Sequence, residues 1–458
     1  MAGVTVRIHA REAVPAVPPD PPRHAYRAPL AGVAVALSLF AAAAVVGVAV
    51  FDKERLHLGW PPLFAQWLPH LGPGTPVAVC VAVLVVVYGP GLAVRLAWRW
   101  LPGSVAVASL AWVLSLALVD GWQRGFVDRL ATGQEYLTAV DDIGDAGVFL
   151  RTFVTRIPID AEGNWPAHVA GHPPGATLTF VLLDRIGLAG GAWAAAFCVL
   201  AGASAAAAVL ITLRAVVGEE VARRAAPFLV LAPAAVWLGV SADGYFAAVA
   251  AWAVALLALS ATGAAQWPRA AAVGSGVLFG WLLYLSYGLV LMAPIAAAVL
   301  VLARTWRPIP CVVVGVVPWV VAFTAAGFSW FEGYTTLVER YYAGVAGVRP
   351  YGYFVWANLA VQVLSVGPAV AAGLASLAVA RRRGGRLAVL VGAGVLAIVV
   401  ADLSGMSKAE TERIWLPFAL WLLPACVALP GGGDRSRWWL AAQGATALVV
   451  NHLWLTRW

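Results

Sequence analysis

Long apolar runs recur along almost the whole of this chain, and they restrict the folds open to it more than any other feature of the sequence. Each run is roughly 18 to 25 residues long, which is enough to cross a hydrocarbon core of about 30 Å as a helix. Of the 458 residues, 62% are hydrophobic and 11% are charged, whereas soluble proteins carry about 25% charged residues. These values exclude a water-soluble globular fold. The sequence predicts an all-α protein, a polytopic bundle of transmembrane helices.

The arginines between the apolar runs predict how the chain threads the membrane. The formal net charge is +8, and membrane proteins concentrate Lys and Arg in cytoplasmic loops. Counting the arginines in this way gives about 13 spans and a cytoplasmic N-terminus. The high content of Ala, Val, Gly and Arg with few Lys indicates a bacterial source, so we expect a location in a bacterial plasma membrane. A nucleic-acid surface is not indicated. The expected spans include 29–51, 76–97, 103–119, a short partial helix at 175–189, then 190–213, 225–241, 243–262, 309–327, 355–380, 386–401, 414–430 and 438–456.

The N-terminal segment differs from the rest of the chain. Residues 1–27 contain four arginines and the run Pro-Ala-Val-Pro-Pro-Asp-Pro-Pro, which cannot form a core, so we expect a disordered cytoplasmic tail. Residues 28–458 are expected to form a single transmembrane domain. The four cysteines lie inside apolar runs, far apart in sequence, which is typical of small buried hydrophobic residues rather than of disulfides or metal ligands.

The segment 120–172 is the longest polar interruption among the apolar runs, and it carries eight of the 22 acidic residues. Loops of this length are usually functional or disordered, and the Trp, Phe, Tyr and Leu residues in this one indicate order. Neighbouring carboxylates raise one another's pKa, which creates a base able to take a proton from a hydroxyl group. Glu135, Asp141 and Asp142 are the candidates for this catalytic base, and Asp120, which follows a span directly, is the alternative. Each could instead be a solvated or helix-capping acid.

The loop ends in His172-Pro-Pro-Gly, immediately before the chain becomes apolar again. Two prolines restrict the backbone, and the first turn of a helix tolerates proline well, so this sequence predicts a rigid helix entry. His172 is then held at a fixed depth beside the carboxylates of the loop. The alternative is a histidine that only packs or caps at the helix start.

Three polar clusters fall on the same, outer side of the membrane by the arginine count. They are the 120–172 loop, Asp243 in a tight turn, and the segment from Lys408 to Arg413. Ionisable groups near membrane depth are costly and mark functional sites, so the sequence predicts one extracytoplasmic site. Arginine suits phosphate because its planar fork donates two parallel hydrogen bonds, and Lys408 adds a second positive charge. The alternatives are ordinary solvated loops and, for Arg413, an interfacial arginine beside an aromatic-belt tryptophan.

The sequence contains no phosphate-binding glycine loop and no Cys/His spacing typical of a metal site. His168 and His172 are four residues apart, but the prolines that follow make a shared helical face doubtful. We therefore predict no zinc site. Whether a divalent cation is required is left open.

In order and type, these motifs resemble the GT-C glycosyltransferases that use polyprenyl-phosphate sugars, such as protein O-mannosyltransferases and aminoarabinose transferases. Families of that class share an acidic motif in the first large outer loop, a His-Pro-Pro or Lys-Pro-Pro helix entry, an acidic turn, and an arginine motif before a late span. The Asp-Glu pair of the class reads Gln-Glu here, and three spans precede the loop rather than one. The matching segments are Gln134-Glu135-Tyr136 or Asp141-Asp142, His172-Pro173-Pro174-Gly175, Ser241-Ala242-Asp243, and Glu412-Arg413-Ile414-Trp415-Leu416-Pro417.

The resemblance implies a mechanism and partners. The donor is a polyprenyl-phosphate sugar, and the acceptor is a cell-envelope glycan, lipid or protein. A loop carboxylate activates the acceptor hydroxyl, which attacks the anomeric carbon with inversion, and Arg413, helped by Lys408, stabilises the leaving lipid phosphate. The aromatic outer loop 328–354 covers the site. Substrate-binding roles are also implied for His172, Asp243, Glu412, Arg340 and Tyr341. The sugar, the acceptor and the oligomeric state are left open.

Two other classes of protein could use the same features. A transporter or lipid flippase also needs buried charges in a helical bundle, although it would more often place them at mid-span on broken helices. A non-catalytic membrane scaffold is the third alternative.

Overall fold

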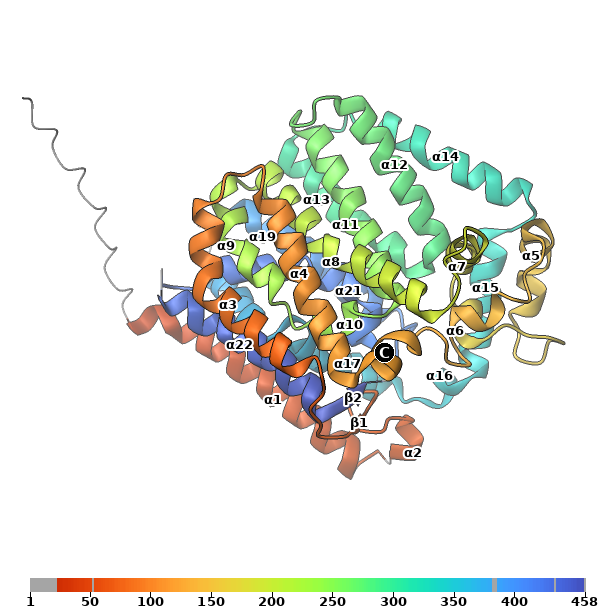
Figure 1. Cartoon of the computed structure of the whole chain (residues 1–458), viewed down its shortest axis with the longest axis horizontal. Helices are drawn as coiled ribbons and strands as arrows, with labels where there is room; N and C mark the ends of the chain where they lie inside the picture. Colours follow the sequence, from red (N-terminus) through yellow and green to blue (C-terminus); the bar gives the residue numbers. More distant parts are fainter. Residues whose placement is uncertain (1–22, 52, 381–384, 432–433, 457–458) are drawn as a thin grey trace, which may run out of the picture.

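The computed structural model describes residues 23–51, 53–380, 385–431 and 434–456, and in these ranges the fold is helical apart from one small antiparallel sheet, β1 (Ala65–Trp67) with β2 (Trp454–Thr456) (Figure 1). The predicted all-α bundle is therefore confirmed. Within the described ranges, six helices are long and apolar enough to cross a membrane: α1 (Arg27–Ala49), α3 (Thr75–Arg95), α4 (Leu101–Ala117, continued to Asp120), α8 (Gly191–Val216), α11 (Ala242–Ala261) and α19 (Gly385–Leu403).

The remaining helices are shorter, bent or less apolar. They are α2 (Lys53–Leu56), α5 (Ala146–Thr152), α6 (Ala167–Gly171), α7 (Pro174–Arg185), α9 (Glu219–Val230), α10 (Ala235–Leu238), α12 (Pro268–Leu285), α13 (Ala293–Ala303), α14 (Ile309–Ala325), α15 (Trp330–Ala343), α16 (Val345–Val348), α17 (Tyr351–Val366), α18 (Pro368–Val379), α20 (Thr411–Ile414), α21 (Leu416–Ala419) and α22 (Asp434–Leu453). Short turns of other helical types include η1 (Arg23–Tyr26), η4 (Tyr136–Ala139), η6 (Tyr287–Met292) and η7 (Leu423–Ala428). The short helix expected at 175–189 is α7.

Several expected spans are broken, and proline accounts for the breaks. The expectation of one helix over 225–241 is wrong, because α9 ends at Val230 and a turn containing Pro233 precedes α10. The expected helix 414–430 is likewise wrong, since it is divided into α20, α21 and η7. Proline lacks the backbone N–H that continues a helix. The span expected at 355–380 is α17 and α18, which meet at 109° around Gly367.

The predicted number of 13 spans is not confirmed. Six helices of the described chain meet the length and composition of a span, or up to eight if each of two bent pairs is one span. The second bent pair is α14 with α15, which meet at 71°, so the segment 328–354 that the sequence predicts as an outer loop is mostly helical. Of the expected N-terminal tail, residues 1–22 lie outside the described residues, and 23–27 already form η1 and the start of α1.

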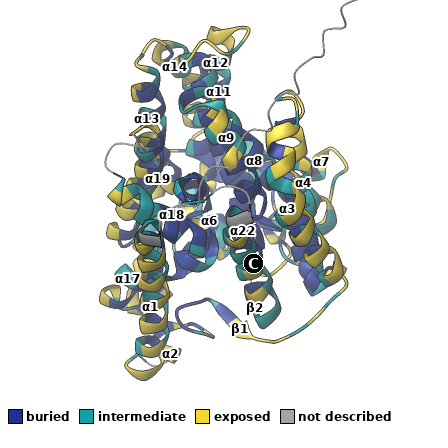
Figure 2. Cartoon of the chain, turned by 90° about the vertical axis from the view of Figure 1, so that its left-hand side faces the viewer, coloured by how far each residue is buried: buried dark blue, intermediate teal, exposed yellow. Residues whose placement is uncertain are grey.

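Helices α8 and α11 form the centre of the bundle. The apolar windows of α8 and α11 are 67% and 72% buried, compared with 11% for α1 and 17% for α3, and Figure 2 shows the same contrast between a dark centre and exposed outer helices. Alanine dominates both central helices, and small side chains let helix backbones approach closely in membranes. The apolar exposed faces of α1 and α3 are suited to contact lipid.

The two ends of the helical bundle differ in their charged residues. At one end, the Gly74 N–H donates to Leu118 O and His452 Nε2 lies 2.9 Å from Thr75 Oγ1, which joins the start of α3 to the ends of α4 and α22. At the other, Arg386 at the start of α19 donates to Val216 O at the end of α8. We call the second end the arginine end; it holds Arg95, Arg214, Arg223, Arg224, Arg386 and Arg437. The opposite end holds Asp120, Asp243 and Leu403 and is called the acidic end.

Candidate functional site

The acidic loop contributes a buried carboxylate–histidine pair at the acidic end. Glu135 Oε1 lies 2.7 Å from Nδ1 of His168, and Glu135 is only 4% exposed. Glu135 immediately precedes η4, and His168 lies on the short helix α6. Gln134 holds these two segments together, because its carbonyl oxygen accepts from the His168 N–H at 3.0 Å and its Oε1 from the Ala167 N–H at 3.4 Å. The sequence Gln134-Glu135 thus fixes both partners of the pair.

Arg413 connects this pair to the start of α11. Its Nη1 donates to Oδ2 of Asp243 at 2.6 Å, and its Nη2 lies 3.3 Å from Glu410 Oε2 and 3.4 Å from His168 Nε2. Asp243 lies in the first turn of α11, whose N-cap is Ser241. Burial alone lowers the pKa of the Arg413 guanidinium, but the carboxylates of Asp243 and Glu410 outweigh it and raise that pKa above its ordinary value. Arg413 therefore stays charged.

His172 occupies the predicted rigid helix entry, at the C-terminal end of α6. Its Nδ1 lies 2.9 Å from the His168 carbonyl oxygen, and its ring lies 5.8 Å from the ring of Tyr136 and 5.6 Å from that of Phe246. Burial lowers the pKa of His172 to about 4, so the ring is neutral at pH 7. Because a carbonyl only accepts, Nδ1 carries the proton. His172 is thus a neutral, fixed side chain in the wall of the site.

The loop before α20 supplies further charge, and its backbone is anchored by Asn358. The Asn358 amide donates to Ser407 O at 2.7 Å and its oxygen accepts from the Ala409 N–H at 3.2 Å. Nζ of Lys408 donates to Ala346 O at 2.8 Å, and the Lys408 N–H donates to the Tyr341 hydroxyl at 3.0 Å. Burial, together with the nearby Arg349, lowers the pKa of Lys408 from its usual value.

A second guanidinium, that of Arg349, lies on the other side of this loop. It donates from Nη1 to Lys408 O at 2.6 Å and from Nε to Leu56 O at 3.0 Å. Its Nη1 is also 3.9 Å from Oε1 of Glu410. Glu410 therefore lies between the guanidinium groups of Arg349 and Arg413.

These groups surround a cavity of about 540 Å³ at the acidic end. Three cationic side chains and one carboxylate are in its wall, together with two histidines. The aromatic side of the wall comes from η6 and α15, which contribute Tyr287, Trp330, Tyr334 and Tyr341. Figure 1 shows α6, α15 and α16 gathered at this end of the molecule. The charged and histidine members are His168, His172, Arg349, Lys408, Glu410 and Arg413.

The other predicted site residues lie elsewhere. Asp120 is 2.9 Å from His70 Nε2 and 2.5 Å from Arg129 Nη2, in a separate ion cluster beside the small sheet. Asp141 and Asp142 are exposed. Arg340 donates to the carbonyl oxygens of Ile157 and Trp165, so it fixes the acidic loop rather than lining the cavity. Glu412 is 2% exposed and is not in the cavity wall.

Three residues of the site were not among the predicted ones: His168, Glu410 and Arg349. The sequence pattern indicates His168 only as a possible metal ligand, with His172. Its place beside Glu135 depends on a contact across 33 residues, for which the sequence offers only Gln134-Glu135 as a signal. Arg349 lies in the aromatic segment 328–354, in which the prediction names Arg340 instead. Glu410 is two residues from Glu412, on a backbone turn that the sequence does not reveal.

Among the residues that the structure describes, no three His, Cys, Asp or Glu side chains lie together as a metal ion would need.

No family model matches the chain, and no curated protein matches it either. The solved structures to which the chain is similar include the following three. The oligosaccharyltransferase of Archaeoglobus fulgidus in complex with Zn and sulfate is 14% identical, with a TM-score of 0.46 over 71% of this chain and 48% of that one. AglB of the same organism, with an inhibitory peptide and a dolichol-phosphate, is 12% identical, with a TM-score of 0.44 over 72% and 50%. ArnT from Cupriavidus metallidurans is 18% identical, with a TM-score of 0.45 over 73% and 61%.

These neighbours are enzymes of the GT-C kind, the class that the sequence motifs resemble. The chain spans less than two thirds of the length of each of the three.

Proposed function

We propose that the protein is a membrane glycosyltransferase that moves a sugar from a lipid-linked phosphate donor to an acceptor hydroxyl at the acidic end of the bundle. One observation carries this proposal: a buried carboxylate–histidine pair and a buried guanidinium meet at the wall of a single cavity of about 540 Å³. The pair supplies a proton acceptor, and the guanidinium supplies a fixed positive charge. Glycosyl transfer from a phosphate needs both at once.

His168 and Glu135 form the acceptor side. His168 faces the cavity, and Glu135 lies behind it at 2.7 Å from Nδ1. A carboxylate in this position orients the imidazole and stabilises its protonated form, as in the triads of hydrolases. The acceptor oxygen bonds to the anomeric carbon while its proton passes to Nε2 of His168. Positioned bases of this kind contribute about 10²- to 10⁴-fold to rate. Glu135 is thus a positioning residue.

Arg413, Arg349 and Lys408 form the phosphate side. The bond from the anomeric carbon to the phosphate oxygen breaks, its electron pair stays on that oxygen, and the negative charge develops beside the cations. Glu410 now lies between the two guanidinium groups, in the position that suits an anion with several oxygens. We infer that the donor phosphate takes the place of the Glu410 carboxylate. Attack from the face opposite the phosphate gives inversion of configuration.

The aromatic wall suits the remaining parts of such a donor. Tyr287 and Trp330 have ring centroids 5.1 Å apart, and Trp330 stacks with Tyr334 at 5.8 Å. Aromatic faces pack against apolar surfaces, and these rings line the same cavity as the charged side chains. By the rule that basic loops stay in the cytoplasm, the arginine end is cytoplasmic and the site is extracytoplasmic.

The test is transfer by the purified protein in lipid nanodiscs, with radiolabelled polyprenyl-phosphate sugars and extracts of envelope acceptors. His168→Gln and Arg413→Lys each should reduce kcat by at least about 100-fold. Asp142→Asn removes an exposed acid of the same loop and should leave turnover unchanged. Equal activity in the wild-type protein and in His168→Gln would refute the assigned acceptor side.

A transporter or flippase is the alternative function that the sequence also allows, and an assay of the same purified protein in vesicles distinguishes it. If no donor supports transfer while reconstituted vesicles take up or flip a substrate, the glycosyltransferase proposal is wrong. The membrane orientation is tested separately, by labelling single cysteines introduced in 120–172 and 402–413 from outside intact cells. Labelling of the two segments from opposite sides would contradict a single site.

A further inference from the structure

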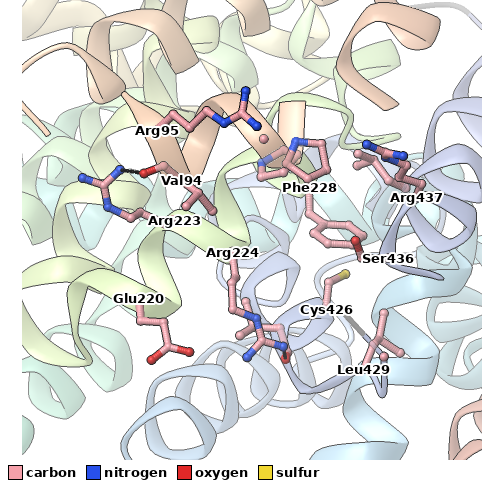
Figure 3. Close-up of a pocket in the computed structure, with 16 residues that line it drawn as sticks. Val94, Arg95, Glu220, Arg223, Arg224, Phe228, Cys426, Leu429, Ser436 and Arg437 are labelled. Atoms are coloured by element: carbon pink, nitrogen blue, oxygen red, sulfur yellow. Dashed lines mark hydrogen bonds between the residues drawn. The ribbon is translucent and has the colours of Figure 1, made fainter. Parts of the chain in front are cut away.

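A second cavity, of about 700 Å³, lies at the arginine end of the bundle, remote from the site described above. Its wall is made by the last turns of α3, by α9, by the end of η7 and the residues that follow it, and by the start of α22. Figure 3 shows Arg95, Arg224 and Arg437 around this cavity, with Phe228 and Cys426 between them. Nothing in the proposed transfer reaction uses these residues.

The cavity is strongly positive. Four arginines line it, against the single carboxylate of Glu220. Of the four, Arg223 has a structural role, because it pairs with Glu219 at 2.7 Å and donates to Ala93 O at 2.7 Å. Arg224 donates one N–H to Val427 O at 2.8 Å. Among the described residues, neither Arg95 nor Arg224 has a carboxylate within ion-pair distance. Their charge is thus available to a ligand.

The rest of the wall is apolar and continues into the lipid-facing surface. Pro90, Val94, Phe228 and Leu440 line the cavity, and the helix α3 that supplies two of them is among the least buried of the candidate spans. Val94 is 66% exposed, on the same turn as Arg95. A ligand here would touch arginines at one end and the hydrocarbon region at the other.

We propose that this cavity binds the headgroup of an anionic membrane phospholipid, with the phosphate between Arg95 and Arg224 and an acyl chain along α3. Guanidinium groups donate paired hydrogen bonds to phosphate oxygens, and basic pockets between transmembrane helices are suited to lipid headgroups. A lipid is favoured over a soluble anion because the apolar part of the wall is continuous with the exposed face of α3. The lipid joins α3, α9 and α22 at this end, and its binding is independent of the proposed transfer.

Binding is measured by native mass spectrometry of the full chain titrated with phosphatidylglycerol or phosphatidylcholine. Two variants test the cavity by different means. The double variant Arg95→Gln/Arg224→Gln removes charge, whereas Gly91→Leu fills space: a Cβ at Gly91 meets no atom within 4 Å, so the substitution is tolerated by the fold. The matched control is Arg269→Gln, which removes an exposed arginine of α12 outside this cavity.

The wild-type protein should bind phosphatidylglycerol in preference to phosphatidylcholine. The double variant should lose roughly ten- to thirty-fold in affinity for phosphatidylglycerol, Gly91→Leu should lose affinity as well, and Arg269→Gln should not change. Equal binding of the two lipids, or a loss in Arg269→Gln as large as in the double variant, would overturn the proposal. Competition by millimolar inorganic phosphate would also overturn it, because it would show an ion site and not a lipid site.

Discussion

Glu412 is an acid that the fold holds in an unfavourable place. It lies on α20, next to Arg413, and is 2% exposed. Its Oε2 has no hydrogen-bond partner among the described residues. The side chain is outside the cavity wall, so we expect Glu412→Gln to change stability and to leave transfer unchanged. This expectation departs from the substrate-binding role that the sequence resemblance implies for Glu412.

The size and sign of the effect follow from the pKa. Burial raises the pKa of Glu412 to about 7, from an ordinary value of 4.5. Below pH 4.5 the carboxyl is protonated in both the folded and the unfolded protein. Between pH 4.5 and 7 only the unfolded state ionises, so the free energy of unfolding falls as the pH rises. Above pH 7 the buried charge lowers the free energy of unfolding by its full amount, about 3 kcal/mol, because each unit of pKa shift is worth about 1.36 kcal/mol.

Thermal unfolding in detergent at pH 4.5 and pH 8 measures this difference. Glu412→Gln, which cannot ionise, should match the wild-type protein at pH 4.5 and be more stable at pH 8, by up to about 3 kcal/mol. The matched control is Glu332→Gln at an exposed acid, for which no such gain is expected. Equal stability of Glu412→Gln and the wild-type protein at pH 8 would refute a buried, costly charge at this position.

Two other substitutions test parts of the fold that support the site. Asp120→Asn should lower the melting temperature and leave kcat unchanged, because Asp120 lies outside the cavity wall and its carboxylate pairs with Arg129 at 2.5 Å. Loss of one partner of a buried ion pair costs about 3 kcal/mol. Gly175→Val should reduce both folded yield and activity, because a Cβ there would lie 2.5 Å from Tyr284 O and would displace the helix that follows His172. Size-exclusion yield and turnover measure this second effect.

The long helices could be predicted because each depends on local information. The spans expected at 29–51, 76–97 and 243–262 agree with α1, α3 and α11 to within two residues. The errors at 225–241 and 414–430 come from segments that are apolar but contain prolines. Such segments are buried like spans, and hydropathy alone does not distinguish a buried irregular turn from a helix. In this part of the fold, tertiary packing decides whether an apolar segment forms a helix or an irregular turn.

The site was predictable in part, for a related reason. Glu135, Asp243 and Arg413 stand out in the sequence because a charge beside an apolar run has to be explained. The structure places His168 between Glu135 and Arg413, and Asp243 against Arg413. Asp141 and Asp142 carry the same sequence signal, yet they are exposed. Sequence position tells which acids are near the membrane surface, whereas only the folded loop tells which of them turn inward.

The loop that carries Glu410 connects charge to conformation. Ala409 and Glu410 have φ values of 76° and 63°, a left-handed backbone that costs non-glycine residues about 1 to 2 kcal/mol each. The Asn358 amide and the Lys408 and Arg349 contacts hold this backbone in place. An anion that replaces the Glu410 carboxylate removes its contacts with Arg349 and Arg413, which help to hold this turn in place. On the proposed function, binding of the donor phosphate and rearrangement of this loop are therefore coupled, so that the cavity changes shape when a donor is bound.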